Sequence, residues 1–288
     1  MPAYPVDGDD PRACGLLTVI VHGFENTATD ATNQWRHDIW PGVKDQINPR
    51  TSNIMVFMWP SDSIIRDFGA HYPGRVETAI SAGVELAKYL QRISGKRNPE
   101  LKVQFVGHSL GCRVVLSAVE QLAKSPQEVP VVGLLLMGAA VPVADCANEG
   151  RWPDKVSKLF REAHGQKVSE NSDVVLYSGN DRVLGMLFPV GERLARRQHP
   201  ESSGSFEAVG LNGGPGQIRW TEKIDSCGIK HTRYMSNPTA LRYVAALLGQ
   251  LIDRQLAERP ECQRSLGERQ PDQRHLPSRL PHWARLLS

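Results

Sequence analysis

The segment 107–111, with the sequence Gly-His-Ser-Leu-Gly, constrains this chain more than any other part of its sequence. A mostly apolar strand pattern over 103–106 precedes it, and an amphipathic helical pattern over 113–123 follows it. A Gly-x-Ser-x-Gly segment between a strand and a helix is typical of a sharp turn that strains the serine backbone and exposes the hydroxyl. The two glycines leave room for the helix to approach the strand. The pattern therefore predicts a strand–turn–helix unit with Ser109 as a nucleophile.

The apolar pattern along the rest of the chain predicts an α/β fold. Short β-branched runs alternate with longer helical patterns, which is typical of parallel strands joined by crossover helices. Most of the short runs are continuously apolar, so we expect a mostly parallel, doubly wound sheet of about six strands with helices on both faces. The expected strands span 16–21, 54–58, 103–106, 131–137, 174–177 and 217–223, and the expected helices span 75–93, 113–123 and 237–251.

A length of 288 residues fits one large catalytic domain followed by a tail. We expect residues 1–14 to form an N-terminal extension and residues 15–253 to form the catalytic domain. Within that domain, 142–172 and 184–216 are polar or rich in glycine, so we expect excursions above the sheet that form a lid or substrate-facing loops. Residues 254–288 are rich in Arg, Gln, Glu and Pro with little periodicity, which predicts a flexible tail.

Composition and charge argue against several kinds of partner. A net charge of +3 without a basic block argues against nucleic acid, and no apolar run approaches the length of a transmembrane segment. The short apolar end of the tail, at 282–287, leaves peripheral contact with a membrane open. The N-terminal sequence lacks the features of a secretion signal, so we expect a cytoplasmic protein whose five cysteines are reduced. We expect neither a cofactor nor a metal, because phosphate-loop, zinc and paired-carboxylate patterns are lacking.

An activated serine requires a base, and the base requires an acid that orients it. In chains with this kind of elbow, the acid and then the base follow the serine in the sequence. Asp181 lies just beyond the strand expected at 174–177, where open α/β sheets build their sites, and is the expected acid. Asp145, which follows the previous strand, is the alternative. His231 lies between the last expected strand and the closing helix, and is the expected base.

Backbone N–H groups are expected to stabilise the oxyanion. One belongs to Leu110, directly after the nucleophile, and the other to Phe24, because Gly23 allows the chain to turn sharply where the first expected strand ends. His22 is expected to shape this loop through structural hydrogen bonds rather than to act as a base. Cys112 starts the helix too late to be the nucleophile, so we expect a packed thiol.

Four segments, 21–24, 107–111, 176–184 and 230–234, together resemble the α/β-hydrolase superfamily. Within it, the chain is similar to the bacterial group of alpha/beta hydrolases of unknown function, whose members share a His-Gly-Phe segment, a Gly-His-Ser elbow, an Asn-Asp-x-x-Leu acid loop and a late histidine followed by an aromatic residue. The similarity extends in order and spacing over roughly 16–251.

The resemblance implies an α/β-hydrolase fold, a Ser109–His231–Asp181 triad, and esterase- or lipase-like chemistry on a small-molecule or lipid ester. The excursion at 184–216 and the Arg-rich tail depart from the family pattern. Because little chain precedes 16–21, we expect the first strands of the complete superfamily fold to be missing.

These features predict a serine hydrolase that cleaves a carboxylic ester through an acyl-enzyme intermediate. The elbow is common to several enzyme classes, so a thioesterase, an amidase or an acyltransferase on the same triad is an alternative. The alternative from another class is a non-catalytic hydrolase fold used for binding, in which Asp181 and His231 do not converge on Ser109.

Overall fold

The computed structural model describes residues 4–5, 15–24, 28–43, 52–61, 68–94, 98, 101–124, 129–146, 151–152, 173–198, 206–214, 222–226 and 228–249. The chain divides into two units, Met1–Leu256 and Ala257–Ser288, and every described residue belongs to the first. The tail expected at 254–288, most of the N-terminal extension expected at 1–14 and most of the excursion expected at 142–172 lie outside the described residues.

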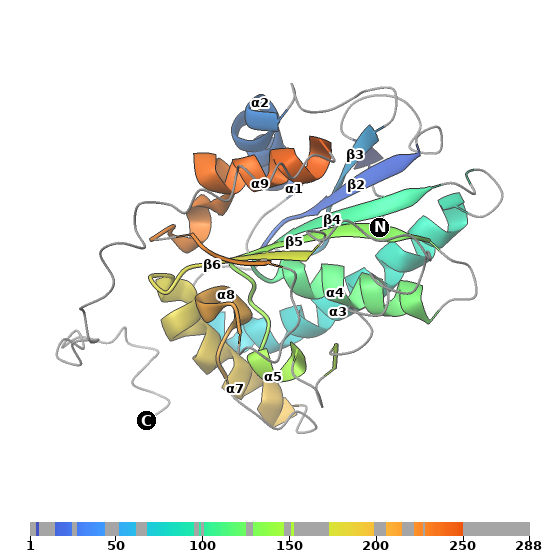
Figure 1. Ribbon diagram of the computed structural model, residues 1–288. Coiled ribbons are helices and arrows are strands. Elements are labelled where there is room, and N and C mark those ends of the chain that lie inside the picture. Colours follow the sequence, from blue (N-terminus) through green and yellow to red (C-terminus); the bar gives the residue numbers. More distant parts are fainter. Residues whose placement is uncertain are drawn as a thin grey trace. The chain divides into compact units, whose positions relative to one another are not determined.

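A seven-stranded sheet runs through the first unit in the order β1-β3-β2-β4-β5-β6-β7 (Figure 1). Strands β2 to β7 are parallel to one another, and only the short β1 pairs antiparallel, with β3. The strands are β1 (Tyr4–Pro5), β2 (Leu16–Val21), β3 (Ser52–Phe57), β4 (Lys102–His108), β5 (Val131–Met137), β6 (Asp173–Tyr177) and β7 (Glu222–Asp225). The prediction of a mostly parallel sheet of about six strands is confirmed.

The structure corrects the predicted ends of the sheet. The last strand, expected at 217–223, is Glu222–Asp225. The expectation that strands before 16–21 are missing was wrong for one strand, because Tyr4–Pro5 pairs with β3 at the edge of the sheet. A two-residue edge strand has no periodicity to detect, and its proline, which lacks an N–H, is tolerated at an edge.

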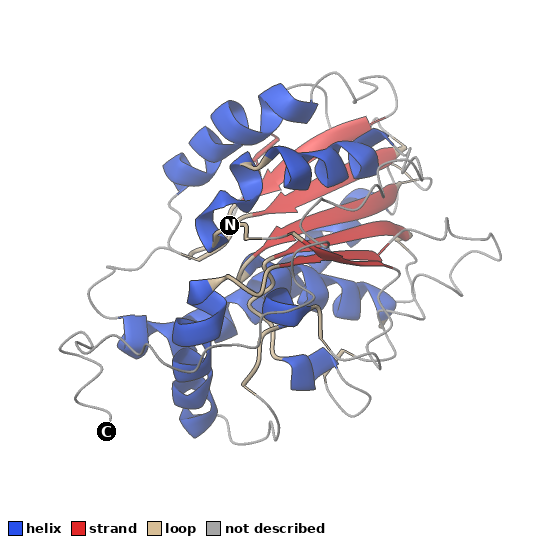
Figure 2. Ribbon diagram, turned by 60° about the vertical axis from the view of Figure 1, so that its left-hand side comes forward, coloured by secondary structure: helices blue, strands red, loops and turns tan. Residues whose placement is uncertain are grey.

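Helices cover both faces of the sheet (Figures 1 and 2). One face carries α3 (Phe68–Ser94), α4 (Gly111–Ala123) and α7 (Phe188–Gln198), and the other carries α1 (Ala28–Gln34), α2 (Trp40–Val43) and α9 (Pro238–Gly249). Shorter segments are η2 (Trp35–Ile39), α5 (Val143–Cys146), η5 (Val183–Leu187), α8 (Val209–Asn212) and η6 (His231–Ser236). All three predicted helices are present, so the predicted alternation of strands and helices is confirmed.

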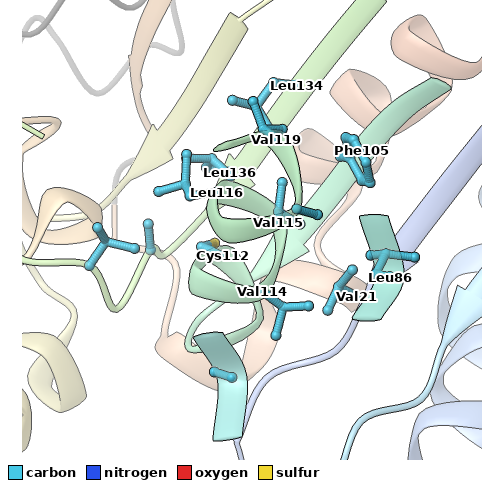
Figure 3. Close-up of a cluster of buried hydrophobic side chains, with 14 of the residues drawn as sticks. Val21, Leu86, Phe105, Cys112, Val114, Val115, Leu116, Val119, Leu134 and Leu136 are labelled. Atoms are coloured by element: carbon cyan, nitrogen blue, oxygen red, sulfur yellow. The ribbon is translucent and has the colours of Figure 1, made fainter. Parts of the chain in front are cut away.

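Two hydrophobic cores lie on opposite faces of the sheet because side chains alternate along each strand. Phe105 of β4 joins the core under α3 and α4, whereas its neighbour Val106 joins the core under α2 and α9. On the first face, α4 packs Val115 and Val119 among buried strand side chains (Figure 3). This packing holds the start of α4 against the carboxyl ends of the central strands, where the serine elbow lies.

Buried charges attach α7 to the start of α4. The guanidinium of Arg113 and the carboxylate of Glu192 form an ion pair, and their side chains are only 3% and 4% exposed. The hydroxyl of Tyr72 in α3 donates to the same carboxylate at 2.7 Å, and Nε of Arg113 donates to the carbonyl of Ala140 at 2.9 Å. Because burying charge is costly, such a pair is tolerated only when its hydrogen bonds are satisfied. The network therefore joins α3, α4, α7 and the loop after β5.

The helix expected at 75–93 begins seven residues earlier, at Phe68, and contains Pro73 in its interior. Proline removes a backbone donor and normally marks a helix start, which explains the late predicted boundary. Tyr72, next to this proline, is 3% exposed, and it closely contacts Gly191 of α7 as well as Glu192. Tertiary contacts therefore stabilise a helical turn that local propensity disfavours.

Backbone hydrogen bonds hold residues 206–214, which belong to the excursion expected at 184–216. The N–H of Val209 donates to Val141 at 2.9 Å, and the N–H of Gly210 donates to Ala139 at 3.0 Å. The N–H of Ser178 donates in turn to Gly210 at 3.1 Å. Residues 206–214 thus tie the loop after β5 to the loop after β6.

None of the helices in the described part of the chain combines the length and apolar character that crossing a bilayer requires.

The buried ion pair predicts a strong and local effect on stability. We expect Glu192→Ala to lower the free energy of unfolding by about 3–5 kcal/mol, because it leaves the Arg113 guanidinium buried without its counter-charge. Glu85→Ala is the matched control, since it removes an exposed Lys88–Glu85 pair from the same fold and should change stability little. Urea unfolding of the three proteins measures the difference, and equal losses in the two variants would contradict the interpretation.

Candidate active site

The serine elbow adopts the strained turn that the sequence predicts. Ser109 has a φ of 53° and is the only residue other than glycine with positive φ in the described parts of the chain. A Cβ at Gly111 would lie 2.3 Å from the carbonyl oxygen of His22, and one at Gly107 would lie 3.1 Å from Cα of Cys112. Only glycine fits at position 111, so the start of α4 can lie directly against the end of β2.

The three residues expected to form the triad converge in one chain of hydrogen bonds. Nε2 of His231 lies 2.7 Å from Oγ of Ser109, and Nδ1 of His231 lies 2.7 Å from Oδ2 of Asp181. Because an ionised carboxylate only accepts, Nδ1 carries the imidazole proton and Nε2 accepts the proton of the Ser109 hydroxyl. Ser109 is 6% exposed, Asp181 1%, and the His231 side chain 10%. These three side chains are therefore largely shielded from water.

A second hydrogen bond, to Oδ1, restrains the carboxylate of Asp181. The N–H of Leu184 donates to Oδ1 at 3.0 Å, so the carboxylate is fixed by the first turn of the helical segment that follows it. Asp145, the alternative acid, lies in α5 and has Arg113 and Glu192 among its electrostatic neighbours. Burial raises the pKa of Asp145. Of the two carboxylates, Asp181 is the one that contacts His231.

His22 shapes the loop after β2, as the sequence predicts. Its side chain is 3% exposed and stacks on Trp59 with ring centroids 5.8 Å apart. Nδ1 lies 2.9 Å from the carbonyl of Gly23, and Nε2 accepts from the N–H of Trp59 at 3.2 Å. The indole Nε1 of Trp59 donates to the His22 carbonyl at 2.9 Å. Burial lowers the pKa of His22, so the ring is suited to a structural role rather than to proton transfer.

The two residues expected to supply oxyanion donors border Ser109. Leu110 follows it directly at the start of α4. On the other side, a Cβ at Gly23 would lie 3.0 Å from Cβ of Ser109, so the segment that leads into Phe24 passes next to the serine. The ring of Phe24 makes an edge contact with Tyr72, with centroids 6.4 Å apart. Both residues therefore belong to segments that lie next to Ser109.

His108 is a member of this site that the sequence analysis missed. It is 6% exposed, and its Nε2 lies 2.8 Å from the backbone carbonyl of His231. Its ring centroid lies 5.2 Å from that of His231 and 5.9 Å from that of Tyr234. Burial and the neighbouring His231 lower the pKa of His108 to about 3, so the ring is neutral near pH 7. The available signal was a histidine at the end of a mostly buried strand, directly before the serine.

Cys112 is a packed thiol, as expected. It is fully buried, its Sγ lies 4.0 Å from the carbonyl of Met137, and burial raises its pKa. Because the thiolate is the reactive form, this cysteine is suited to packing rather than to nucleophilic attack. Among the residues that the structure describes, no group of His, Cys, Asp and Glu side chains has the arrangement of a metal site.

Comparison with known families gives a match over most of the chain. Residues 12–250 match the family described as "Alpha/beta hydrolase of unknown function (DUF900)". This range contains Ser109, Asp181 and His231. No curated protein sequence matches the chain.

Three solved structures illustrate what the fold is similar to. The RedJ thioesterase from the prodiginine biosynthetic pathway of Streptomyces coelicolor is 13% identical, with 87% of this chain and 94% of that chain covered and a TM-score of 0.41. A lipase-esterase related protein from Clostridium acetobutylicum is 11% identical, with 84% and 96% covered and a TM-score of 0.36. The siderophore hydrolase EstB from Aspergillus fumigatus is 12% identical, with 83% and 92% covered and a TM-score of 0.39.

The buried, neutral His108 predicts a component of stability that depends on pH. Its folded pKa, about 3, lies below the ordinary histidine pKa of 6.5, so the unfolded chain binds more protons between these values. The stability that neutral His108 contributes is present above pH 6.5 and is lost as the pH falls toward 3. We expect wild type to lose up to about 1.4 kcal/mol per pH unit relative to His108→Gln in this range. Urea unfolding between pH 7 and pH 4.5 measures this, and parallel curves for the two proteins would contradict it.

Proposed function

The chain belongs to the family of alpha/beta hydrolases of unknown function, and on that premise we propose that it is a serine hydrolase that cleaves carboxylic esters. The observation that carries the proposal is the continuous hydrogen-bond chain from Asp181 through His231 to Ser109, with both contacts at 2.7 Å. A nucleophile, a base and an orienting acid within hydrogen-bond reach are what acyl transfer requires.

Ser109 is the proposed nucleophile. Its Oγ attacks the ester carbonyl carbon while Nε2 of His231 takes the hydroxyl proton. The resulting tetrahedral oxyanion accepts hydrogen bonds from the backbone N–H groups of Phe24 and Leu110. When the C–O bond to the alcohol breaks, His231 returns the proton to the leaving oxygen, and the acyl group stays on Ser109. Water then attacks the acyl-enzyme with the same base, which releases the carboxylic acid and restores the serine.

Asp181 acts through His231. Its buried carboxylate keeps the imidazole proton on Nδ1, so that Nε2 faces Ser109 with a lone pair. When His231 becomes positively charged, the adjacent negative charge stabilises it in a site that excludes water. The backbone N–H of Leu184, which donates to Oδ1 at 3.0 Å, restrains this carboxylate.

The same arrangement can serve reactions with other leaving groups. Thioester hydrolysis, amide hydrolysis and transfer to another acceptor proceed through the same acyl-enzyme, so the triad by itself does not separate them. Convergence of all three side chains favours each of these over a binding protein without catalysis, for which no such geometry is needed. We propose a small-molecule or lipid ester as the substrate.

The proposal is tested with p-nitrophenyl esters from acetate to palmitate. We expect Ser109→Ala and His231→Ala to lower kcat by at least about 10³-fold. Asp181→Asn should lower it by about 10²–10⁴-fold, because the imidazole loses its orienting charge. Asp145→Asn, the matched control, removes a neighbouring carboxylate that does not contact His231 and should retain most of the activity. The chain-length optimum distinguishes an esterase from a lipase, and a thioester of the preferred acyl group tests the alternative leaving group.

Fluorophosphonate labelling provides an assay that does not depend on the substrate. Wild type should be labelled and Ser109→Ala should not. Labelling that persists in Ser109→Ala would overturn the assignment of the nucleophile. A folded wild type that neither hydrolyses the esters nor reacts with the fluorophosphonate would favour the non-catalytic alternative.

A further inference from the structure

The mechanism above gives no task to His108, a buried titratable group beside the reacting residues. His108 precedes the nucleophile in the chain, yet its side chain contacts the segment that supplies the base. The two segments are 123 residues apart in the sequence. The imidazole of His108 therefore connects the elbow to the base segment directly.

The direction of this hydrogen bond fixes the tautomer of His108. A backbone carbonyl can only accept, so Nε2 of His108 carries the proton and donates to the oxygen of His231 at 2.8 Å. Nδ1 is then an unprotonated acceptor, and it has no hydrogen-bond partner among the described residues. It lies 3.0 Å from the place that a Cβ on Gly23 would occupy. The ring therefore fills the space between Gly23 and the backbone of His231.

The base needs such support because its imidazole must meet two partners at once. His231 is the first residue of η6, and its ring reaches Ser109 with one nitrogen and Asp181 with the other. A main-chain shift of about 1 Å would lengthen at least one of these bonds, and misplacement of that size can reduce catalysis about 10²-fold. A hydrogen bond to the carbonyl of His231 itself restrains this shift more directly than packing at a distance can.

We propose that His108 is a positioning residue, which holds the backbone of His231 against the nucleophile elbow so that the imidazole stays within reach of both Ser109 and Asp181. This inference rests on the proposed function for its catalytic consequence. His108 touches neither the substrate nor the reacting atoms in this role, and it acts entirely through His231.

The chemistry of the side chain suits this task better than that of other donors. Lysine or arginine at position 108 would also donate to the carbonyl, but its positive charge would oppose the imidazolium that forms on His231. A neutral imidazole supplies the donor without that charge, and the low pKa of His108 keeps it neutral while His231 gains and loses its proton. A glutamine amide could supply the same kind of donor, which makes it the conservative replacement.

The test compares two substitutions at position 108 by steady-state ester hydrolysis. We expect His108→Leu, which has no donor, to lower kcat about 10–100-fold while KM changes less than about twofold. His108→Gln should recover most of the loss. Gln104→Leu is the matched control, because it removes a buried hydrogen bond to Thr18 at 2.7 Å from the same strand, away from the serine. It should lower the melting temperature without lowering kcat.

Proton NMR gives a readout that does not depend on turnover. The proton that Nδ1 of His231 shares with Asp181 should give a far-downfield signal, assigned by its absence in His231→Gln. We expect this signal to be present in wild type and His108→Gln, and to be lost or broadened in His108→Leu. A folded His108→Leu that keeps the signal and the wild-type kcat would overturn the proposal. A wild type that shows the signal but does not react with fluorophosphonate would instead contradict only the proposed function.

Discussion

The close approach of α4 to the end of β2 is the constraint on which the rest of the structure depends. At Gly111 the helix passes so near to β2 that a Cβ would lie 2.3 Å from the carbonyl oxygen of His22. The turn that makes this approach possible places Ser109 at a φ of 53°. Such backbone strain persists only where the surrounding structure enforces it, and here buried strands and helices do so on both faces of the sheet.

Several buried polar groups among the described residues connect segments that border the serine. The Arg113–Glu192 pair joins α4 to α7 and reaches the loop after β5 through the carbonyl of Ala140. The N–H of Ala140 donates to the carbonyl of Ser109 at 3.1 Å, so the network extends to the elbow itself. Groups of this kind contribute little net stability compared with an apolar core, but they restrict how the segments can be arranged. Here, that restriction favours one geometry around the serine.

Predictions from the sequence succeeded where the signal is local. The strand Leu16–Val21 and the strand Val131–Met137 were predicted to the residue, because each is a short, mostly apolar run of the kind that a buried parallel strand requires. The start of α3 was predicted too late, because Pro73 disfavours a helix locally while buried contacts of Tyr72 stabilise it. The two-residue strand Tyr4–Pro5 was missed because pairing with β3, not its own pattern, defines it.

The sequence by itself determined the strand–turn–helix elbow and the α/β layering, since each depends on residues near one another in the chain. It also determined the order in which Ser109, Asp181 and His231 follow one another. Only the tertiary structure decided that Asp181 rather than Asp145 meets His231, and that His108 contacts the same histidine. These hydrogen bonds join residues 50 and 123 positions apart. Their geometry follows from strand order and from the direction of each side chain, neither of which a local pattern encodes.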